Sequence, residues 1–218
     1  MSTLLHTYRG RFKYDEATAH AYQNKSSRRH RAEMKLVERA LRQIPRDHRL
    51  LDLPCGGGRA TLHAAALGFK VSAADYSDAM LEIARRRLRE QGLDCPVEKQ
   101  DIENLEYADD SFDSVLCFRL FHHFPTPEVR ERAVAELCRV SRRYVLLSYF
   151  SPFSITSIKR RLRVSLGGRQ SEKHATPLRE VRSYFERQGF HLVRDLAVLP
   201  LLHTLHLAVF ERAPAVAR

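Results

Sequence analysis

The stretch LDLPCGGGR, residues 51–59, places three consecutive glycines directly after a short apolar segment. The apolar residues predict a strand over 49–53, and a helical pattern over 60–67 follows the glycines. Glycine lets the backbone approach a ligand closely, and the N-terminus of a helix presents N–H groups that lack partners within the helix. The stretch therefore predicts a strand, a ligand-binding turn and a helix in direct succession.

Strand and helix patterns alternate along the chain after this turn. Further strands are predicted over 70–74, 97–100, 112–118, 144–149, 191–199 and 205–210, and helices over 32–42, 77–91, 126–140 and 176–189. Alternation at these lengths suits right-handed crossover connections. We therefore predict a doubly wound, mostly parallel seven-stranded sheet of the Rossmann-like kind, in which the last strand is antiparallel.

The length of 218 residues favours one domain with a single core. Within it we expect an N-terminal helical cap, a ligand-binding core, a substrate-side cap or insertion, and a last helix with two closing strands. These four parts cover residues 1–48, 49–150, 151–175 and 176–211.

The chain carries a net charge of +11, and the excess lies at its two ends. Residues 1–49 and 151–218 each hold 12 basic and 5 acidic residues, whereas residues 50–150 hold 13 and 16. Basic flanks indicate an anionic partner, namely a phosphorylated or acidic substrate, an anionic membrane surface or RNA, or simply a solvated surface. The densest basic cluster, residues 159–163, lacks the interleaved aromatic residues of a stacking platform, so nucleic acid is not the favoured partner.

Targeting and redox signals are few. The chain has no apolar run of 18 residues and no apolar region typical of a signal peptide near its start, so we expect no transmembrane segment. Cys55, Cys95, Cys117 and Cys138 form no CxxC pair. We interpret them as reduced thiols of a cytoplasmic protein rather than as a zinc site.

The glycine run fits neither of two common phosphate-binding motifs. In a G-x-G-x-x-G frame the last position is Thr61 when counted from Gly56, and Arg59 when counted from Pro54. The Gly-Lys-Ser/Thr sequence of a P-loop is absent as well. What fits is D-x-G-x-G-x-G from Asp52 to Gly58, with Pro54 in place of the first glycine.

This pattern resembles motif I of the class I S-adenosylmethionine-dependent methyltransferases. Three later features are similar to that family in the same order: Asp75 at the end of the second strand, the pair Asp101-Ile102 after the third, and the segment SFDSVLCFRLFHHF at 111–124. The resemblance implies S-adenosyl-L-methionine as the cofactor. It covers residues 20–150 well and the C-terminal part loosely.

The resemblance also implies roles for individual residues. Asp75 would bind the ribose hydroxyls, Asp101 the adenine amino group, and Asp52 the amino group of the methionine part. Ile102 and Met80 would pack on the two faces of the adenine ring, and an arginine such as Arg28 would bind the carboxylate. The full predicted set of cofactor-binding residues is Asp52, Pro54, Cys55, Gly56, Gly58, Asp75, Tyr76, Met80, Asp101, Ile102, Phe118 and Arg28.

The residues that would contact the methyl acceptor are less clearly indicated by the sequence. His123 is the candidate general base or cleft wall, and no metal site is expected, because no further ligands stand at a known spacing from it. Arg119 should pair with a carboxylate, for example that of the cofactor or substrate, since an unpaired arginine would repel the sulfonium. The predicted activity is methyl transfer to an oxygen or nitrogen atom of an anionic small-molecule or lipid acceptor. RNA methylation and a non-catalytic binding role, suggested by Pro54, are the alternatives.

Overall fold

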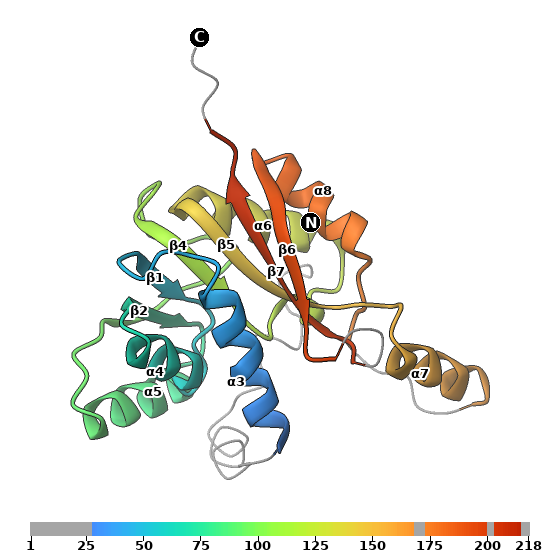
Figure 1. Ribbon diagram of the computed structural model, residues 1–218, viewed down its shortest axis with the longest axis horizontal. Helices are drawn as coiled ribbons and strands as arrows, with labels where there is room; N and C mark the ends of the chain where they lie inside the picture. Colours follow the sequence, from blue (N-terminus) through green and yellow to red (C-terminus); the bar gives the residue numbers. More distant parts are fainter. Residues whose placement is uncertain (1–27, 168–172, 200–202, 215–218) are drawn as a thin grey trace, which may run out of the picture.

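The computed structural model describes residues 28–167, 173–199 and 203–214, and its centre is one seven-stranded sheet with helices on both faces (Figure 1). The strand order is β3-β2-β1-β4-β5-β7-β6. The strands are β1 (Arg49–Asp52), β2 (Lys70–Asp75), β3 (Val97–Lys99), β4 (Phe112–Cys117), β5 (Ser141–Phe150), β6 (Phe190–Ala197) and β7 (Leu205–Arg212). The helices are α3 (Arg28–Leu41), α4 (Arg59–Ala66), α5 (Asp78–Glu90), η1 (Phe121–His123), α6 (Pro127–Val140), α7 (Ile155–Ser165) and α8 (Leu178–Glu186).

The strand directions confirm the predicted sheet. β1 pairs in parallel with β2 and β4, and β2–β3 and β4–β5 are parallel as well. β7 is antiparallel to both β5 and β6. Parallel strands end at the same edge of a sheet, and ligands of such sheets bind beyond that edge. The segments that follow β1, β2, β3 and β4 are therefore brought together.

Alternation along the strands builds two cores, one on each face of the sheet. Leu50 of β1 and Leu116 of β4 pack on one face with α3 and α4. Leu51 and Val115, their chain neighbours, pack on the other face with α6 and α8. Successive side chains of a strand point to opposite faces, and a strand that is apolar at every position is typical of a sheet covered on both sides. This double covering holds the strand ends, and hence the site, in fixed positions.

Several helix boundaries follow the expected caps. Ser77 caps α5, its side chain accepting from the Met80 N–H, and Thr126 caps α6, which opens with Pro127. Local side-chain chemistry at the caps therefore determined where these helices begin.

One expected helix start was wrong, and one helix was not predicted. Residues 28–31 were predicted to precede the first helix, but α3 begins at Arg28. Its first turn is polar and has no apolar periodicity to reveal it, although arginine is a good helix former. The segment 151–175 was expected only as a cap or insertion without a named helix, and it contains α7. There the dense basic run masked apolar residues at helical spacing.

Candidate functional site

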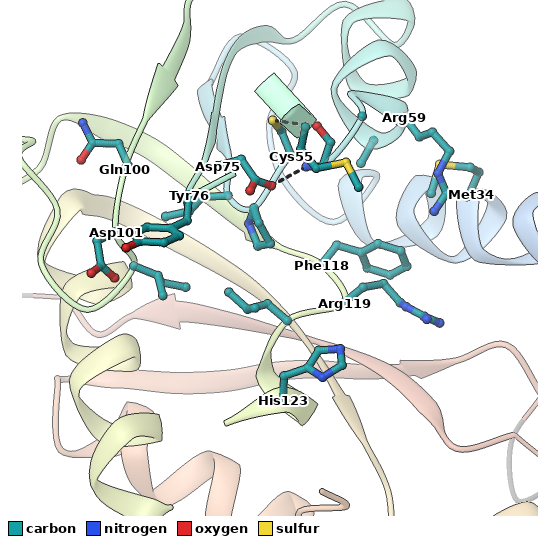
Figure 2. Close-up of a pocket in the computed structure, with 18 residues that line it drawn as sticks. Met34, Cys55, Arg59, Asp75, Tyr76, Gln100, Asp101, Phe118, Arg119 and His123 are labelled. Carbon is teal, nitrogen blue, oxygen red and sulfur yellow. Dashed lines mark hydrogen bonds between the residues drawn. The ribbon is translucent and has the colours of Figure 1, made fainter. Parts of the chain in front are cut away.

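A pocket opens at the carboxyl edge of the sheet, where the segments after β1, β2, β3 and β4 converge (Figure 2). Its walls come from these four segments and from the first halves of α3 and α4. Ten of the thirteen predicted cofactor-binding and catalytic residues line it, together with eight residues outside that set. The lining residues are Met34, Leu53, Pro54, Cys55, Gly56, Gly57, Arg59, Ala60, Asp75, Tyr76, Met80, Gln100, Asp101, Ile102, Phe118, Arg119, Leu120 and His123.

Two glycines of the turn, Gly56 and Gly58, have different structural roles. Gly56 has a φ of +52°, and a Cβ placed on it would meet no atom within 4 Å, so its backbone borders open space in the pocket. Gly58, with φ +78°, is the N-cap of α4, and its Cβ would lie 3.4 Å from Ala84 of α5. Gly58 was predicted to contact the cofactor, but it does not line the pocket, because it packs the turn against α5.

Asp75 joins the turn to the end of β2. Its Oδ2 accepts from the Gly56 N–H at 2.8 Å and its Oδ1 from the Ser77 N–H at 2.9 Å. Burial raises the pKa of this carboxyl, and the two backbone N–H groups oppose that shift. A carboxylate offers about four acceptor positions, so each oxygen keeps capacity for another donor. Asp75 is thus a rigid acceptor pair that faces the pocket.

Asp52 lies beneath the turn and not in the pocket wall. Its side chain is fully buried, and its Oδ2 accepts from the Thr61 hydroxyl at 2.6 Å. Its Oδ1 has no hydrogen-bond partner among the described residues. Burial raises the pKa of Asp52 to about 7, and the nearby charge of Asp75 adds to the shift. Two buried carboxylates close to the pocket favour a cationic ligand over an anionic one.

The raised pKa of Asp52 predicts a pH-dependent stability. Folding raises this pKa from 3.8 to about 7, so the folded protein is stabilised while Asp52 is protonated and loses that stability as the pH rises through 7. Between pH 5.5 and 8.5 the loss is about 2 kcal/mol. We expect Asp52→Asn to abolish this loss, and urea unfolding at several pH values measures it. If both proteins lose stability in parallel over this range, Asp52 does not titrate near pH 7.

Cys55 occupies the middle of the turn without being a nucleophile. The thiol is buried, and its Sγ–H donates to the Gly56 carbonyl oxygen at 3.4 Å. Burial raises the pKa of the Cys55 thiol well above its ordinary value, and Asp75 and Asp52 raise it further. A thiol that stays protonated is inert, so Cys55 shapes the wall and takes no part in covalent chemistry.

One end of the pocket is lined by apolar side chains together with a carboxylate and an amide group. Tyr76, Gln100 and Asp101 lie together on one side of Asp75 (Figure 2). Ile102 and Met80 are buried wall residues, and the Asp101 Oδ1 accepts from the Glu103 N–H at 3.1 Å. This composition suits an aromatic base with an amino group. Gln100 was not predicted, although its place directly before Asp101 was a usable signal.

The opposite end contains an ion-pair cluster that sequence reasoning missed. Met34, Arg59, Phe118 and Arg119 lie there (Figure 2). Arg119 donates from Nη1 to Oε1 of Glu33 at 2.7 Å, and Nη2 of Arg59 lies 3.9 Å from Oε2 of the same residue. The carboxylate expected for Arg119 is therefore part of this chain, in α3, and not part of a cofactor or substrate.

The backbone of Arg119 is unusual as well. Its φ is +71°, which is uncommon for a residue with a side chain, and its N–H donates to the Ser148 hydroxyl at 2.6 Å. Strained residues of this kind cluster at functional sites, where the surrounding structure holds them. Here the turn directs the side chain to Glu33 and the following residues to η1.

The two histidines of η1 face different surroundings. His123 lines the pocket across from the glycine turn, whereas His122 is fully buried and stacks on Phe150 with ring centroids 4.0 Å apart. His123, the candidate base, is thus the histidine that faces the cleft. Among the described residues, no group of three or more His, Cys, Asp or Glu side chains is arranged to hold a metal ion. Arg28 begins α3, but its side chain lies outside the part of the chain that the structure describes.

Comparison with known proteins points to one family. Residues 50–143 match the model of a methyltransferase domain family. Over 97 residues the chain is 36% identical to a ubiquinone biosynthesis O-methyltransferase of Xanthomonas axonopodis pv. citri, covering 44% of this chain and 40% of the relative. Over 98 residues it is 38% identical to the methyltransferase GfsG of Streptomyces halstedii, covering 44% and 34%. The chain thus spans well under half the length of these curated relatives.

The similarity of structure extends further along the chain. The crystal structure of a magnesium protoporphyrin IX methyltransferase from Synechocystis PCC 6803, with bound SAH, superposes with a TM-score of 0.71 at 18% identity and covers 84% of both chains. At 18% sequence identity, this similarity shows a shared fold and nothing about the activity of this chain. The segment with the glycine turn, Asp75 and Asp101 lies inside the matched domain. Residues 50–143 of this protein thus match the methyltransferase domain family, and the chain shares the fold of the Synechocystis methyltransferase.

Proposed function

We propose that this protein is an S-adenosylmethionine-dependent methyltransferase that acts on an oxygen or nitrogen atom of an anionic small-molecule or lipid acceptor. The observation that carries the proposal is the convergence of the Gly56 turn, Asp75 and Asp101 on one pocket. These three features are far apart in the sequence, and the parallel strands β1, β2 and β3 bring them together at one edge of the sheet. The matched methyltransferase domain and the O-methyltransferase relative support the same activity.

The pocket fits the chemical groups of the cofactor from one end to the other. Gln100, Asp101 and Ile102 would hold the adenine, and the two Asp75 oxygens would accept from the ribose diol. The methionine part would lie toward the end with Arg59 and Arg119. The cofactor carries a sulfonium and an ammonium group, and the buried carboxylates Asp52 and Asp75 offset such charge. Asp52 lies buried beneath the glycine turn, so it would act on the ammonium group through its charge and not by direct contact.

The cofactor supplies an activated methyl group, so the chain itself has to bind, align and deprotonate. In-line displacement gains most of its rate from holding donor and acceptor in the correct geometry. The rigid turn, held by Asp75 and by the close packing of Gly58 on α5, provides one side of that geometry. His123 faces the same pocket and would take the proton of a hydroxyl or amine acceptor.

An anionic acceptor is supported by cations on the acceptor side of the pocket. The ring of Phe150, at the end of β5, has the Arg119 guanidinium 6.0 Å and the Lys173 ammonium 5.8 Å from its centroid. Cations gathered beside a cleft raise the local concentration of an anionic substrate.

The direct test has two parts. Calorimetry with S-adenosylhomocysteine should give saturable binding, and the absence of heat at high micromolar concentration would count against the proposal. Incubation with methyl-labelled cofactor and a cell extract then shows where the label goes. We expect label in a small-molecule or lipid fraction. Label in RNA would identify an RNA methyltransferase, and binding without transfer to any fraction would indicate a non-catalytic protein.

His123→Ala tests the acceptor side. We expect kcat to fall by about tenfold, because alignment and not proton transfer supplies most of the rate. The Kd for S-adenosylhomocysteine should stay within about twofold, since the predicted cofactor contacts are elsewhere. His123→Gln should lose the acidic limb of the pH–rate profile while keeping the volume of the wall. An unchanged kcat and pH profile in both variants would remove His123 from the mechanism.

A further inference from the structure

Exposed apolar side chains gather on one part of the molecule, α7 and the residues on either side of it. Five of the eight large apolar residues that are exposed in the described parts of the chain lie between 153 and 166, and they are 44 to 80% exposed. Most large apolar side chains of the described residues are buried, and a contiguous exposed group marks an interaction surface. The five are Phe153, Ile155, Ile158, Leu162 and Leu166.

Helical spacing places four of these residues in one stripe. Ile155, Ile158 and Leu162 follow one another at intervals of three and four residues, and Leu166 continues the row beyond the helix end. The opposite side is anchored: Ser157 is buried, and its hydroxyl donates to the Ser151 carbonyl oxygen at 2.7 Å. Figure 1 shows α7 extending away from the body of the molecule, and the four residues of the stripe are 44 to 80% exposed.

The charge of α7 has a single sign. The helix sequence ITSIKRRLRVS contains four basic residues and no acidic one. Lys159 and Arg163, both exposed, follow Ile155 and Leu162 along the helix and border the stripe on one side. Segment 151–175 as a whole holds six basic residues and one acidic residue. The partner of this surface therefore has to be apolar and anionic at the same time.

This requirement selects among the candidate partners. A second copy of α7 would bring like charges together, which opposes pairing of the stripes. RNA would satisfy the basic residues but would leave the aliphatic stripe in water, because aliphatic side chains provide no stacking face. An anionic bilayer meets both needs, since its head groups are negative and its acyl region begins directly beneath them. Among the described residues, no helix could span a bilayer.

We propose that α7 docks this protein on the surface of an anionic lipid bilayer. The apolar stripe enters the boundary between head groups and acyl chains, and the basic residues lie against the lipid phosphates. α7 follows the carboxyl end of β5, the edge of the sheet at which the pocket opens, and Phe150 at that end is close to Arg119 of the pocket. Docking thus brings the pocket edge toward the lipid surface. Docking through α7 does not depend on whether the pocket transfers methyl groups.

Vesicle flotation of the full chain tests the proposal. Vesicles of phosphatidylcholine mixed with phosphatidylglycerol should carry the protein with them, and vesicles of phosphatidylcholine alone should carry at least about tenfold less. Leu162→Asp and Lys159→Glu should each weaken binding to the anionic vesicles by about tenfold. Matched controls are Val193→Asp and Lys70→Glu, which change an exposed apolar residue of β6 and an exposed lysine of β2. Equal losses in the controls would overturn the assignment to α7.

A fluorescence measurement separates insertion from simple charge attraction. The chain contains no tryptophan, so Leu162→Trp introduces a single reporter in the stripe. Its emission should shift to shorter wavelength on anionic vesicles and be quenched by brominated acyl chains. Unshifted, unquenched emission on vesicle-bound protein would overturn the proposal. So would α7 variants that lose affinity for an RNA but keep full affinity for the vesicles.

Discussion

Replacing Asp75 by alanine is expected to weaken binding of S-adenosylhomocysteine by about 2–3 kcal/mol, roughly a hundredfold in Kd. The variant removes a charged acceptor pair that faces the pocket, and hydrogen bonds to charged groups contribute more than those between neutral groups. The same carboxylate holds the Gly56 and Ser77 N–H groups. The loss therefore combines a missing contact with a less ordered turn.

Two further variants separate these contributions. Asp75→Asn keeps one acceptor oxygen and should fall between wild type and alanine. Asp78→Ala removes an exposed carboxylate three residues along the chain and provides the matched control for net charge. Calorimetry gives the Kd, and thermal unfolding shows how far the turn is destabilised. Wild-type affinity in a folded Asp75→Ala protein would refute the assignment of this residue to the cofactor.

Replacing Glu33 by alanine is expected to lower the free energy of unfolding by about 3 kcal/mol. The Glu33 side chain is only 3% exposed, and its two oxygens face the guanidinium groups of Arg119 and Arg59. Removing the carboxylate leaves two positive charges close together at the edge of a pocket, and breaking a buried pair from one side is strongly destabilising. The variant also releases Arg119, whose strained backbone the ion pair helps to hold.

The same helix supplies the control for Glu33. Glu38→Ala removes a more exposed glutamate of α3 that pairs with Arg42 on the surface, and its cost should stay below about 1 kcal/mol. Glu33→Gln keeps the shape and one acceptor, so its cost should be smaller than that of alanine. Urea unfolding at neutral pH measures all three. Equal effects of Glu33→Ala and Glu38→Ala would mean that the cluster contributes no more than a surface ion pair.

The sheet and much of the pocket could be predicted from sequence because their signals are local. Periodicity located the strands, and Ser77 and Thr126 marked helix starts through their capping side chains. Asp75 and Asp101 stand at strand ends, and the parallel arrangement of β2 and β3 places both at one edge of the sheet. Because parallel strands of this fold end at one edge of the sheet, the sequence positions of these residues were enough to predict that they lie close together.

The first turn of α3 and the whole of α7 were harder to predict for a physical reason. Sequence patterns reveal helices by an apolar face that packs on a core, and polar turns give no such signal. α3 begins with RRHR, and α7 turns its apolar stripe away from the protein. In α7 the basic residues that stand among the apolar ones hid their helical spacing.

The sequence by itself determined the order of the elements, the parallel sheet, and the residues that reach its carboxyl edge. Only the tertiary structure decided which of those residues face the pocket: Gly57 does so and Gly58 does not, and Asp52 lies under the turn with a pKa near 7. It also decided that Glu33 pairs with Arg119 across 86 positions of the chain. Strand direction and helix caps follow from neighbours in the chain, whereas burial, charge pairing and pKa depend on groups that meet only after folding.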